Sequence, residues 1–468
     1  MQFTSFSFLF VFLPILLVLY YVCKPEIRKI VLLLFSLLFY SFGSPAYMLL
    51  LCVMTLLNIF LAILIQTFRD RNAILARIFL ILGIICDVGV LVGYKCIDFI
   101  LPLSNRIFDT SYETGIILIP LGISFFTFKA ISFIADVYRK KIESVSFIDA
   151  ANYLSFFAQI ESGPIQRYNS FANERDFSGT LLATGVTRFM AGFAKKIVLA
   201  DVLSKIVSEI FDSTLVMSTG LAWLGSVCFS LQLYYDFSGY SDMAIGIGNM
   251  LGIECEPNFN FPYCTKSVSE FWRRWHISLG SWFKDYVYIP MGGSRVKPYR
   301  VYINLFVVWF LTGLWHGTGL SFIAWGLGYF VVISIEKGFR FPSRFKSKIT
   351  GNIYRIFVLL FINFQWVLFR SSGLKAGLRY IKDMVIFKHE TIPALRAWFL
   401  LKDYGAFIIL AIIFATPIAE FAKEKCEKNV KAQRIYDVIS GVFILVAFIL
   451  AVTFVICGQH SPFLYGNF

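Results

Sequence analysis

The chain has 468 residues, of which 58% are hydrophobic and only 15% are charged. Soluble domains carry about 25% charged residues, so this chain cannot expose its whole surface to water. Its net charge of +14 does not indicate nucleic-acid binding, because the Lys and Arg residues form short clusters between apolar runs, as in the loops of membrane proteins. The composition therefore predicts a membrane protein whose basic loops contact anionic lipids of the bilayer.

Apolar runs without Asp, Glu, Lys or Arg indicate membrane helices. They comprise residues 6–22, 30–42, 48–65, 215–235, 301–335 and 438–457, and the apolar stretch 353–369, which contains the single charge of Arg355, is expected to be a further span. Polar backbone groups in lipid must be satisfied within the segment, and these runs lack the alternation of a β-barrel. We therefore expect an all-α polytopic protein with about ten to thirteen membrane helices. The expected single domain, residues 1–468, comprises N-terminal helices in 1–140, a core in 145–370 and C-terminal helices in 400–460.

Charge clusters orient the two ends of the chain. Basic residues follow the first, third and fifth predicted helices, at residues 24–29, 69–77 and 139–141. Since basic loops remain in the cytoplasm, the N-terminus is expected outside, and the basic stretches 337–348 and 423–434 are expected inside. Between residues 145 and 215, charges interrupt the apolar stretches. Amphipathic or re-entrant segments are expected there, and their topology stays open.

Two carboxylates follow the apolar run 215–235. Asp236 and Asp242 flank a short segment that contains Ser238. They could shape the mouth of a binding site, or cap a helix end or a loop. The nine cysteines include no CxxC pair, so neither a disulfide framework nor a zinc site is predicted. No other metal site is expected.

His276 is one of four histidines and lies in an aromatic and basic segment, residues 269–279. The alternating Trp and Arg residues, such as Trp275 and Arg274, fit a segment at the cytoplasmic interface of the membrane. An interfacial belt does not account for a histidine among them. Arg273 and Arg274 could also attract a phosphate-bearing donor from the cytoplasm.

His316 lies at the middle of the charge-free run 301–335. Both ends of this run are basic and expected in the cytoplasm, so the run must form a hairpin. Each arm of about fifteen residues gives roughly 23 Å of helix, against a hydrocarbon core of about 30 Å, so His316 should stop short of the outer surface. A titratable ring at that depth is costly unless it lines a cavity. We therefore predict a functional histidine, with a structural histidine bonded to a carbonyl as the alternative.

Acyl transfer to a hydroxyl is chemistry that a histidine at this depth can support. A neutral imidazole can take the hydroxyl proton as the oxygen attacks a thioester carbonyl, a step typically worth about 10²- to 10⁴-fold in rate. An ordinary pKa near 6.5 suits this role, and burial favours the neutral form. The sequence contains no hydrolase nucleophile elbow, HExxH, EF-hand loop or Walker A motif, so metal-dependent and nucleotide-hydrolysing mechanisms have no support.

The two histidine motifs resemble those of the membrane-bound O-acyltransferase (MBOAT) family, most of all its bacterial branch of alginate and peptidoglycan O-acetyltransferases. The similarity covers nearly the whole chain. It includes the segments at residues 120–128, 163–165, 196–201, 235–244 and 258–263. One departure is Glu161, which lies in residues 157–163 where this branch usually has apolar residues.

The resemblance implies an MBOAT fold in which helices surround a central tunnel, with the core 145–370 as the catalytic part. His316 matches the catalytic histidine and would act as general base. His276 matches a second active-site position and would orient or polarise the acyl group. The other residues expected to contact substrate are Trp315, Gly317, Arg273, Arg274, Trp275, Asp236, Ser238, Asp242 and Asn260.

The resemblance also implies a relay with no permanently bound cofactor. Acetyl-CoA would bind from the cytoplasm, and the acetyl group would pass to an extracytoplasmic transferase or a small membrane partner. That partner would place it on a polysaccharide. The implied location is the bacterial cytoplasmic membrane.

Three alternatives remain at this point. A D-alanyl transfer protein of teichoic acid synthesis shares the histidine motif around His316, although residues 288–293 and the chain length favour the acetyl branch. A transporter or flippase for a cell-wall precursor would need charges along a central pathway, and repeat-related halves would support it. A structural scaffold for a polysaccharide exporter predicts that neither histidine matters.

Overall fold

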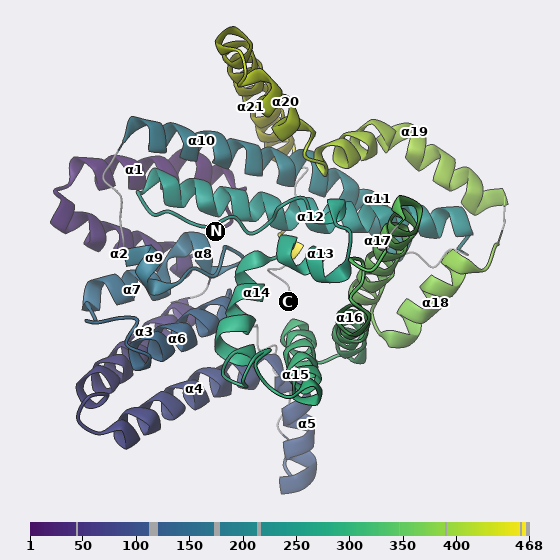
Figure 1. Cartoon of the computed structure of the whole chain (residues 1–468). Helices are drawn as coiled ribbons and strands as arrows, with labels where there is room; N and C mark the ends of the chain where they lie inside the picture. The colour runs from purple at the N-terminus through teal and green to yellow at the C-terminus, as the bar shows by residue number, and fades with distance from the viewer. Residues whose placement is uncertain are drawn as a thin grey trace. The chain divides into compact units, whose positions relative to one another are not determined.

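The computed structural model describes residues 1–43, 45–111, 120–172, 178–212, 217–345, 347–388, 391–458 and 461–464. Within these ranges the regular structure is helical and contains no strand, which confirms the all-α class. Figure 1 traces the helices along the chain. The residues group into two compact units, Met1–Phe189 with Met243–Glu256, and Met190–Asp242 with Pro257–Phe468.

Six described helices are long and apolar enough to cross a bilayer. They are α3 (Pro45–Phe68), α4 (Ala73–Lys95), α16 (Leu320–Phe339), α17 (Lys348–Arg370), α19 (Thr391–Phe414, from Ile392) and α21 (Val430–Ile456). The protein is therefore a multi-pass membrane protein. Fewer helices meet these criteria than the ten to thirteen expected, because several of the others are short or polar. For example, α2 (Pro25–Ser41) has only 17 residues, and α12 (Thr219–Met250) carries two carboxylates.

Unit 1 contains a helix that is buried along almost all of its length. This helix, α6 (Ile123–Tyr138), has every side chain from Ile123 to Val137 buried. Asp87 of α4 is also buried, and its Oδ1 accepts a hydrogen bond of 2.8 Å from the amide of Asn58 in α3. The helices that lie wholly in this unit are α1 (Leu13–Val22), α2, α3, α4, α5 (Ile97–Phe108), α6 (Ile123–Tyr138), α7 (Phe147–Ser155), α8 (Phe157–Ile160) and α9 (Tyr168–Ala172). The short α7 to α9 agree with the interrupted pattern expected after residue 145.

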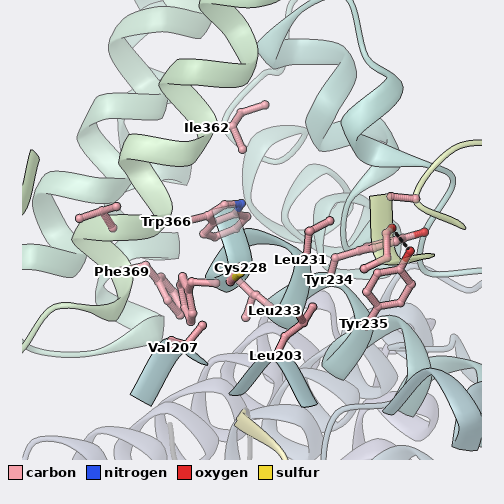
Figure 2. Packing of buried hydrophobic residues seen from close by; sticks show 14 of the residues in the cluster. Leu203, Val207, Cys228, Leu231, Leu233, Tyr234, Tyr235, Ile362, Trp366 and Phe369 are labelled. Atoms are coloured by element: carbon pink, nitrogen blue, oxygen red, sulfur yellow. Dashed lines mark hydrogen bonds between the residues drawn. The ribbon is translucent and has the colours of Figure 1, made fainter. Parts of the chain in front are cut away.

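Unit 2 contains the segments with both histidine motifs. Its helices are α11 (Asp201–Phe211), α13 (Val268–Arg274), α14 (Ile277–Phe283), α15 (Pro298–His316), α16, α17, α18 (Leu374–Val385), α19, α20 (Ile418–Cys426) and α21. Both α10 (Gly179–Ala194) and α12 contribute residues to each unit. A large apolar cluster joins α11, α12 and α17, and Figure 2 shows part of it, including Leu203, Leu233 and Trp366. This cluster gives the histidine-bearing segments a rigid support.

Candidate active site

His316 lies at the end of the first arm of a helical hairpin formed by α15 and α16. The arms cross closely at two glycines: a Cβ on Gly313 would lie 2.6 Å from the Phe322 carbonyl oxygen, and one on Gly326 would lie 2.5 Å from that of Trp309. The predicted hairpin is therefore present, but its arms of 19 and 20 residues are longer than expected. They are longer because the helices continue through the charged residues that flank the apolar run. At about 28 Å, the first arm nearly matches the hydrocarbon core.

Aromatic rings enclose the His316 side chain, which is 4% exposed. Its ring centroid lies 4.6 Å from that of Trp315, 4.9 Å from Trp325 and 5.1 Å from Phe369. Trp325 belongs to α16 and Phe369 to α17, so three helices fix the imidazole.

His276 lies between two short helices whose orientation is set by buried polar contacts. The hydroxyl of Ser267 caps α13 by accepting from the amide of Glu270 at 3.0 Å. The buried carboxylate of Glu336 in α16 accepts from the amides of Val268 and Ser269, at 2.6 and 2.8 Å. A carboxylate at a helix N-terminus stabilises the otherwise unpaired amides. Through Glu336, the hairpin that carries His316 also holds the helix that leads to His276.

The backbone of His276 is left-handed, with φ of 46° and ψ of 53°. This conformation costs a non-glycine residue about 1 to 2 kcal/mol. It is maintained because the His276 carbonyl accepts from the amides of Leu279 and Gly280, both at 3.1 Å, and the next amide donates to the Asn258 carbonyl at 3.0 Å. A turn of this kind directs the ring inward, and His276 is 1% exposed.

Asn258 fixes the tautomer of His276. Its Oδ1 accepts from the backbone amide of Ser278 at 3.1 Å and from the Ser278 hydroxyl at 2.9 Å. Because a backbone amide can only donate, the contacted atom must be the amide oxygen of Asn258. The Nδ1 of His276 lies 3.2 Å from the same oxygen and must therefore carry the proton. The lone pair of neutral His276 is then on Nε2, which can accept a proton or a hydrogen bond but cannot donate one.

Burial lowers the pKa of His276 from 6.5 to about 3. His276 is thus neutral in the folded protein at physiological pH, whereas it protonates near pH 6.5 when the chain unfolds. The contribution of the neutral ring to the free energy of unfolding is therefore fully present above about pH 6.5. It decreases by up to about 1.4 kcal/mol per pH unit as the pH falls toward 3.

We expect the melting temperature in detergent to fall more steeply between pH 7 and 5.5 for wild type than for His276→Gln. Parallel curves for the two proteins would contradict the lowered pKa.

Trp315 lies near both histidines. Its ring centroid is 4.6 Å from that of His316 and 6.4 Å from that of His276. Gly317 has an extended backbone and lets the Phe322 ring approach closely, since a Cβ at this position would lie 2.5 Å from that ring. The structure thus brings four predicted residues, His276, Trp315, His316 and Gly317, into one region.

A mostly apolar pocket of about 520 Å³ lies beside this region. Its wall includes Trp272 and Arg273 from α13, Ile277 and Gly280 from α14, and Val308 and Thr312 from α15. Ile277 follows His276 directly, and Thr312 precedes His316 by about one helical turn. Arg273 and Lys284 add positive charge to the wall. The pocket therefore combines an apolar lining with two cations, close to both histidines.

Three predicted residues around His276 have structural contacts instead of lining this pocket. Arg274 forms an ion pair of 2.9 Å with Glu270 and donates to the backbone carbonyl of Asn260 at 3.3 Å. Trp275 is 1% exposed and packs on Trp366, with ring centroids 4.9 Å apart. Asn260 is exposed, whereas Asn258, two residues earlier, is buried.

The predicted carboxylates of α12 lie in ion pairs. Lys196, which is 0% exposed, lies 2.6 Å from Asp236 and 2.7 Å from Asp201. Asp242 pairs with Lys195 at 2.7 Å. Ser238 is buried beside them, and its hydroxyl has no hydrogen-bond partner in the described part of the chain.

The Lys196 cluster also holds the described end of the chain. The hydroxyl of Ser461 donates to Asp201 at 2.6 Å, and the amide of Leu464 donates to Asp236 at 2.9 Å. Phe463, between them, is 1% exposed, and its ring centroid lies 4.7 Å from the Lys196 ammonium. Asp236 therefore anchors a segment of unit 2 that is distant in the sequence. The residues next to Asp236 in the sequence did not predict this contact.

Comparison with known proteins gives this site a family context. The model of the membrane-bound O-acyltransferase family matches residues 136–372, which include both histidines. The chain is 34% identical to the probable alginate O-acetylase AlgI of Azotobacter vinelandii, with 100% of each chain covered. It is 33% identical to the peptidoglycan O-acetyltransferase of Helicobacter pylori, over 98% of this chain and 96% of that one. It is 29% identical to the teichoic acid D-alanyltransferase of Bacillus subtilis, over 53% of this chain and 67% of that one.

Proposed function

Since the chain belongs to the membrane-bound O-acyltransferase family and is an acyltransferase, we propose that it takes an acetyl group from cytoplasmic acetyl-CoA and passes it across the membrane for O-acetylation of an extracytoplasmic polysaccharide. Both of these relatives that match along nearly the full chain, among others, are named as acetyl-transferring enzymes. The donor, the direction and the acceptor class are parts of this proposal. The observation that carries it is the pair of buried imidazoles that both lie near Trp315, next to a pocket with an apolar lining and two cations.

In the proposed reaction, His316 is the general base. It takes the proton of an acceptor hydroxyl while the hydroxyl oxygen attacks the thioester carbonyl of acetyl-CoA. The new C–O bond forms, the C–S bond breaks, and the proton is returned to the departing thiolate, which leaves as the thiol of CoA. Removal of water from the buried site strengthens these polar interactions.

His276 has a positioning role in this proposal. Its Nε2 is a hydrogen-bond acceptor in the tautomer set by Asn258, so it can hold a donor group of either substrate but cannot polarise the acetyl carbonyl by donation. The tautomer thus favours orientation over polarisation, the two roles expected from the sequence.

The pocket beside the histidines is the proposed donor site. The phosphates of acetyl-CoA would pair with Arg273 and Lys284, and its pantetheine arm would follow the apolar wall along α15. Arg273→Gln is expected to raise the KM for acetyl-CoA about tenfold or more with a smaller change in kcat, since a charge-assisted hydrogen bond is worth about 1.5 to 3 kcal/mol.

The matched control for this test is Arg300→Gln, which removes the same charge from an exposed position in the first turn of α15. It should keep the wild-type KM. An unchanged KM in a folded Arg273→Gln protein would reject the pocket as the donor site. Both variants should be assayed as full-length protein in detergent, by following thiol release from acetyl-CoA.

D-alanyl transfer is the second candidate function, because one relative with that activity in its name matches about half of this chain. The two candidates differ in the group transferred. Membranes supplied with isotopically labelled acetyl-CoA or labelled D-alanine should incorporate only the acetyl label in a manner that depends on His316. The proposed relay partner, an extracytoplasmic transferase or a small membrane protein, would be the first species labelled.

A further inference from the structure

A second pocket in unit 2, of about 480 Å³, lies between α12, α17 and α19. It takes no part in the proposed chemistry, and its wall is largely apolar. The wall includes Trp223 and Leu231 of α12, Ile356 and Leu360 of α17, and Ile412 of α19. Of these, Ile356 and Ile412 are 59% and 49% exposed. In a membrane protein, exposed residues of this kind face lipid, so the pocket is a groove open to the bilayer.

Among the described residues that line this groove, Arg355 is the one that is charged. It lies in the second turn of α17, one of the six helices long and apolar enough to cross the membrane. No hydrogen bond or ion pair links Arg355 to any residue in the described part of the chain. A cation within a membrane segment is costly, and such residues normally pair with an anion or reach the membrane surface.

Arg355 marks the end of the groove that is closer to the start of α17 and to the basic loop before it. Arg355 is seven residues from the start of α17, which is roughly 10 Å along the helix. The preceding basic loop packs on this end, because the rings of Phe341 and Phe345 lie 5.7 and 5.3 Å from that of Tyr354. This loop contributes Arg340 and Arg344. The far end of the groove, at Asn363, lies about 12 Å further along the helix.

We propose that this groove binds an anionic phospholipid, with the phosphate paired to Arg355 and one acyl chain along the apolar wall. The guanidinium is suited to bidentate pairing with phosphate. The basic loop that packs on the neighbouring Tyr354 favours lipids with net negative charge over zwitterionic ones. The apolar wall extends about 12 Å along α17 from Arg355, which is long enough for part of a lipid acyl chain. The rest of the acyl chain would continue into the bilayer.

Fluorescence quenching by brominated lipids tests this proposal on the full-length protein. The protein is placed in zwitterionic phosphatidylcholine vesicles, and phosphatidylglycerol with brominated chains is titrated in. The signal from Trp223, which lines the groove, is taken as the difference between each protein and its Trp223→Phe counterpart. We expect saturable quenching by brominated phosphatidylglycerol and at least tenfold weaker apparent binding of brominated phosphatidylcholine.

Two variants change the two parts of the site separately. Arg355→Gln should weaken phosphatidylglycerol binding about tenfold and abolish the preference over phosphatidylcholine. Ala415→Phe, which fills the groove at a lining position, should reduce quenching by both lipids. Lys348→Gln removes a charge from the first residue of the same helix, outside the groove lining, and should bind as wild type.

Equal quenching by the two lipids, or an unchanged preference in folded Arg355→Gln, would overturn the proposal. Absence of any Trp223 quenching would also overturn it, because another occupant, such as a second copy of the chain or a partner helix, would then fill the groove. A melting curve for each variant establishes that it is folded. The readout does not depend on acetyl transfer, so it is independent of the proposed function.

Discussion

Replacing His316 with glutamine is expected to lower the rate of acetyl transfer from acetyl-CoA about 100- to 10,000-fold, because the general base is lost. Glutamine retains much of the volume of the ring, so the aromatic enclosure formed by Trp325 and Phe369 should persist. The loss should appear mainly in kcat, since the proposed donor pocket is lined by other residues. Stopped-time assays of CoA thiol release, with a soluble acceptor alcohol present, measure this rate.

The control for His316→Gln is His389→Gln, a change of the same kind at a histidine outside both motifs. That variant should keep wild-type turnover. If His316→Gln unfolds at the wild-type temperature and still turns over at the wild-type rate, His316 is not the base. The same assay with His276→Gln should show an intermediate loss, since that ring orients a substrate group.

Replacing Lys196 with alanine is expected to destabilise the protein by about 3 to 5 kcal/mol, the usual cost of breaking a buried ion pair. The carboxylates of Asp201 and Asp236 would remain buried without their cation, since all three side chains are at most 3% exposed. The segment Ser461–Leu464 should also detach, because two of its hydrogen bonds and the cation–π contact of Phe463 depend on this cluster. Thermal unfolding in detergent measures the first effect, and protease sensitivity near the C-terminus measures the second.

The neighbouring residue Lys195 provides a matched control. It pairs with Asp242 at 2.7 Å, but its side chain is 35% exposed, so water partly replaces the lost partner. Lys195→Ala should therefore cost about 1 kcal/mol or less. Equal melting temperatures for the two alanine variants would contradict the account of the Lys196 cluster. Adding Asp201→Asn and Asp236→Asn to Lys196→Met should recover much of the loss, because no buried charge then remains unpaired.

The helical class and the membrane location follow from apolar runs, and this part of the fold was predictable. The run 301–335 also predicted a hairpin with His316 near its tip, which the structure confirms. Its arms were underestimated, because the charged residues next to the run remain helical: α15 begins at Pro298 and α16 ends at Phe339. Absence of charge marks the part of a helix that lies in lipid, and it does not mark where the helix ends.

The candidate site was predictable only in part. His276 and His316 are rare residues in unusual surroundings, so each could be identified individually. Asn258 was missed, although it lies in the same short segment as Asn260. The segment forms neither a helix nor a strand, so the sequence has no periodicity that indicates which asparagine faces the imidazole. Burial distinguishes them, with Asn258 1% exposed.

Long-range ion pairs explain the other differences. Asp236 pairs with Lys196, 40 residues earlier, and contacts Leu464, 228 residues later. Glu336 holds the start of α13 from 68 residues away. A single sequence contains no periodicity that marks such pairs, because each partner is surrounded by ordinary helical residues. A buried acidic residue in an apolar helix indicates only that a partner exists.

The most direct test follows a labelled acetyl group from acetyl-CoA to a hydroxyl. The purified full-length protein, reconstituted in vesicles, is supplied with isotopically labelled acetyl-CoA on one side and a polysaccharide acceptor, with its extracytoplasmic transferase, on the other. We predict an alkali-labile acetyl ester on the polysaccharide with wild-type protein, and at least a 100-fold lower yield with His316→Gln. Equal ester formation by the two proteins would contradict this prediction.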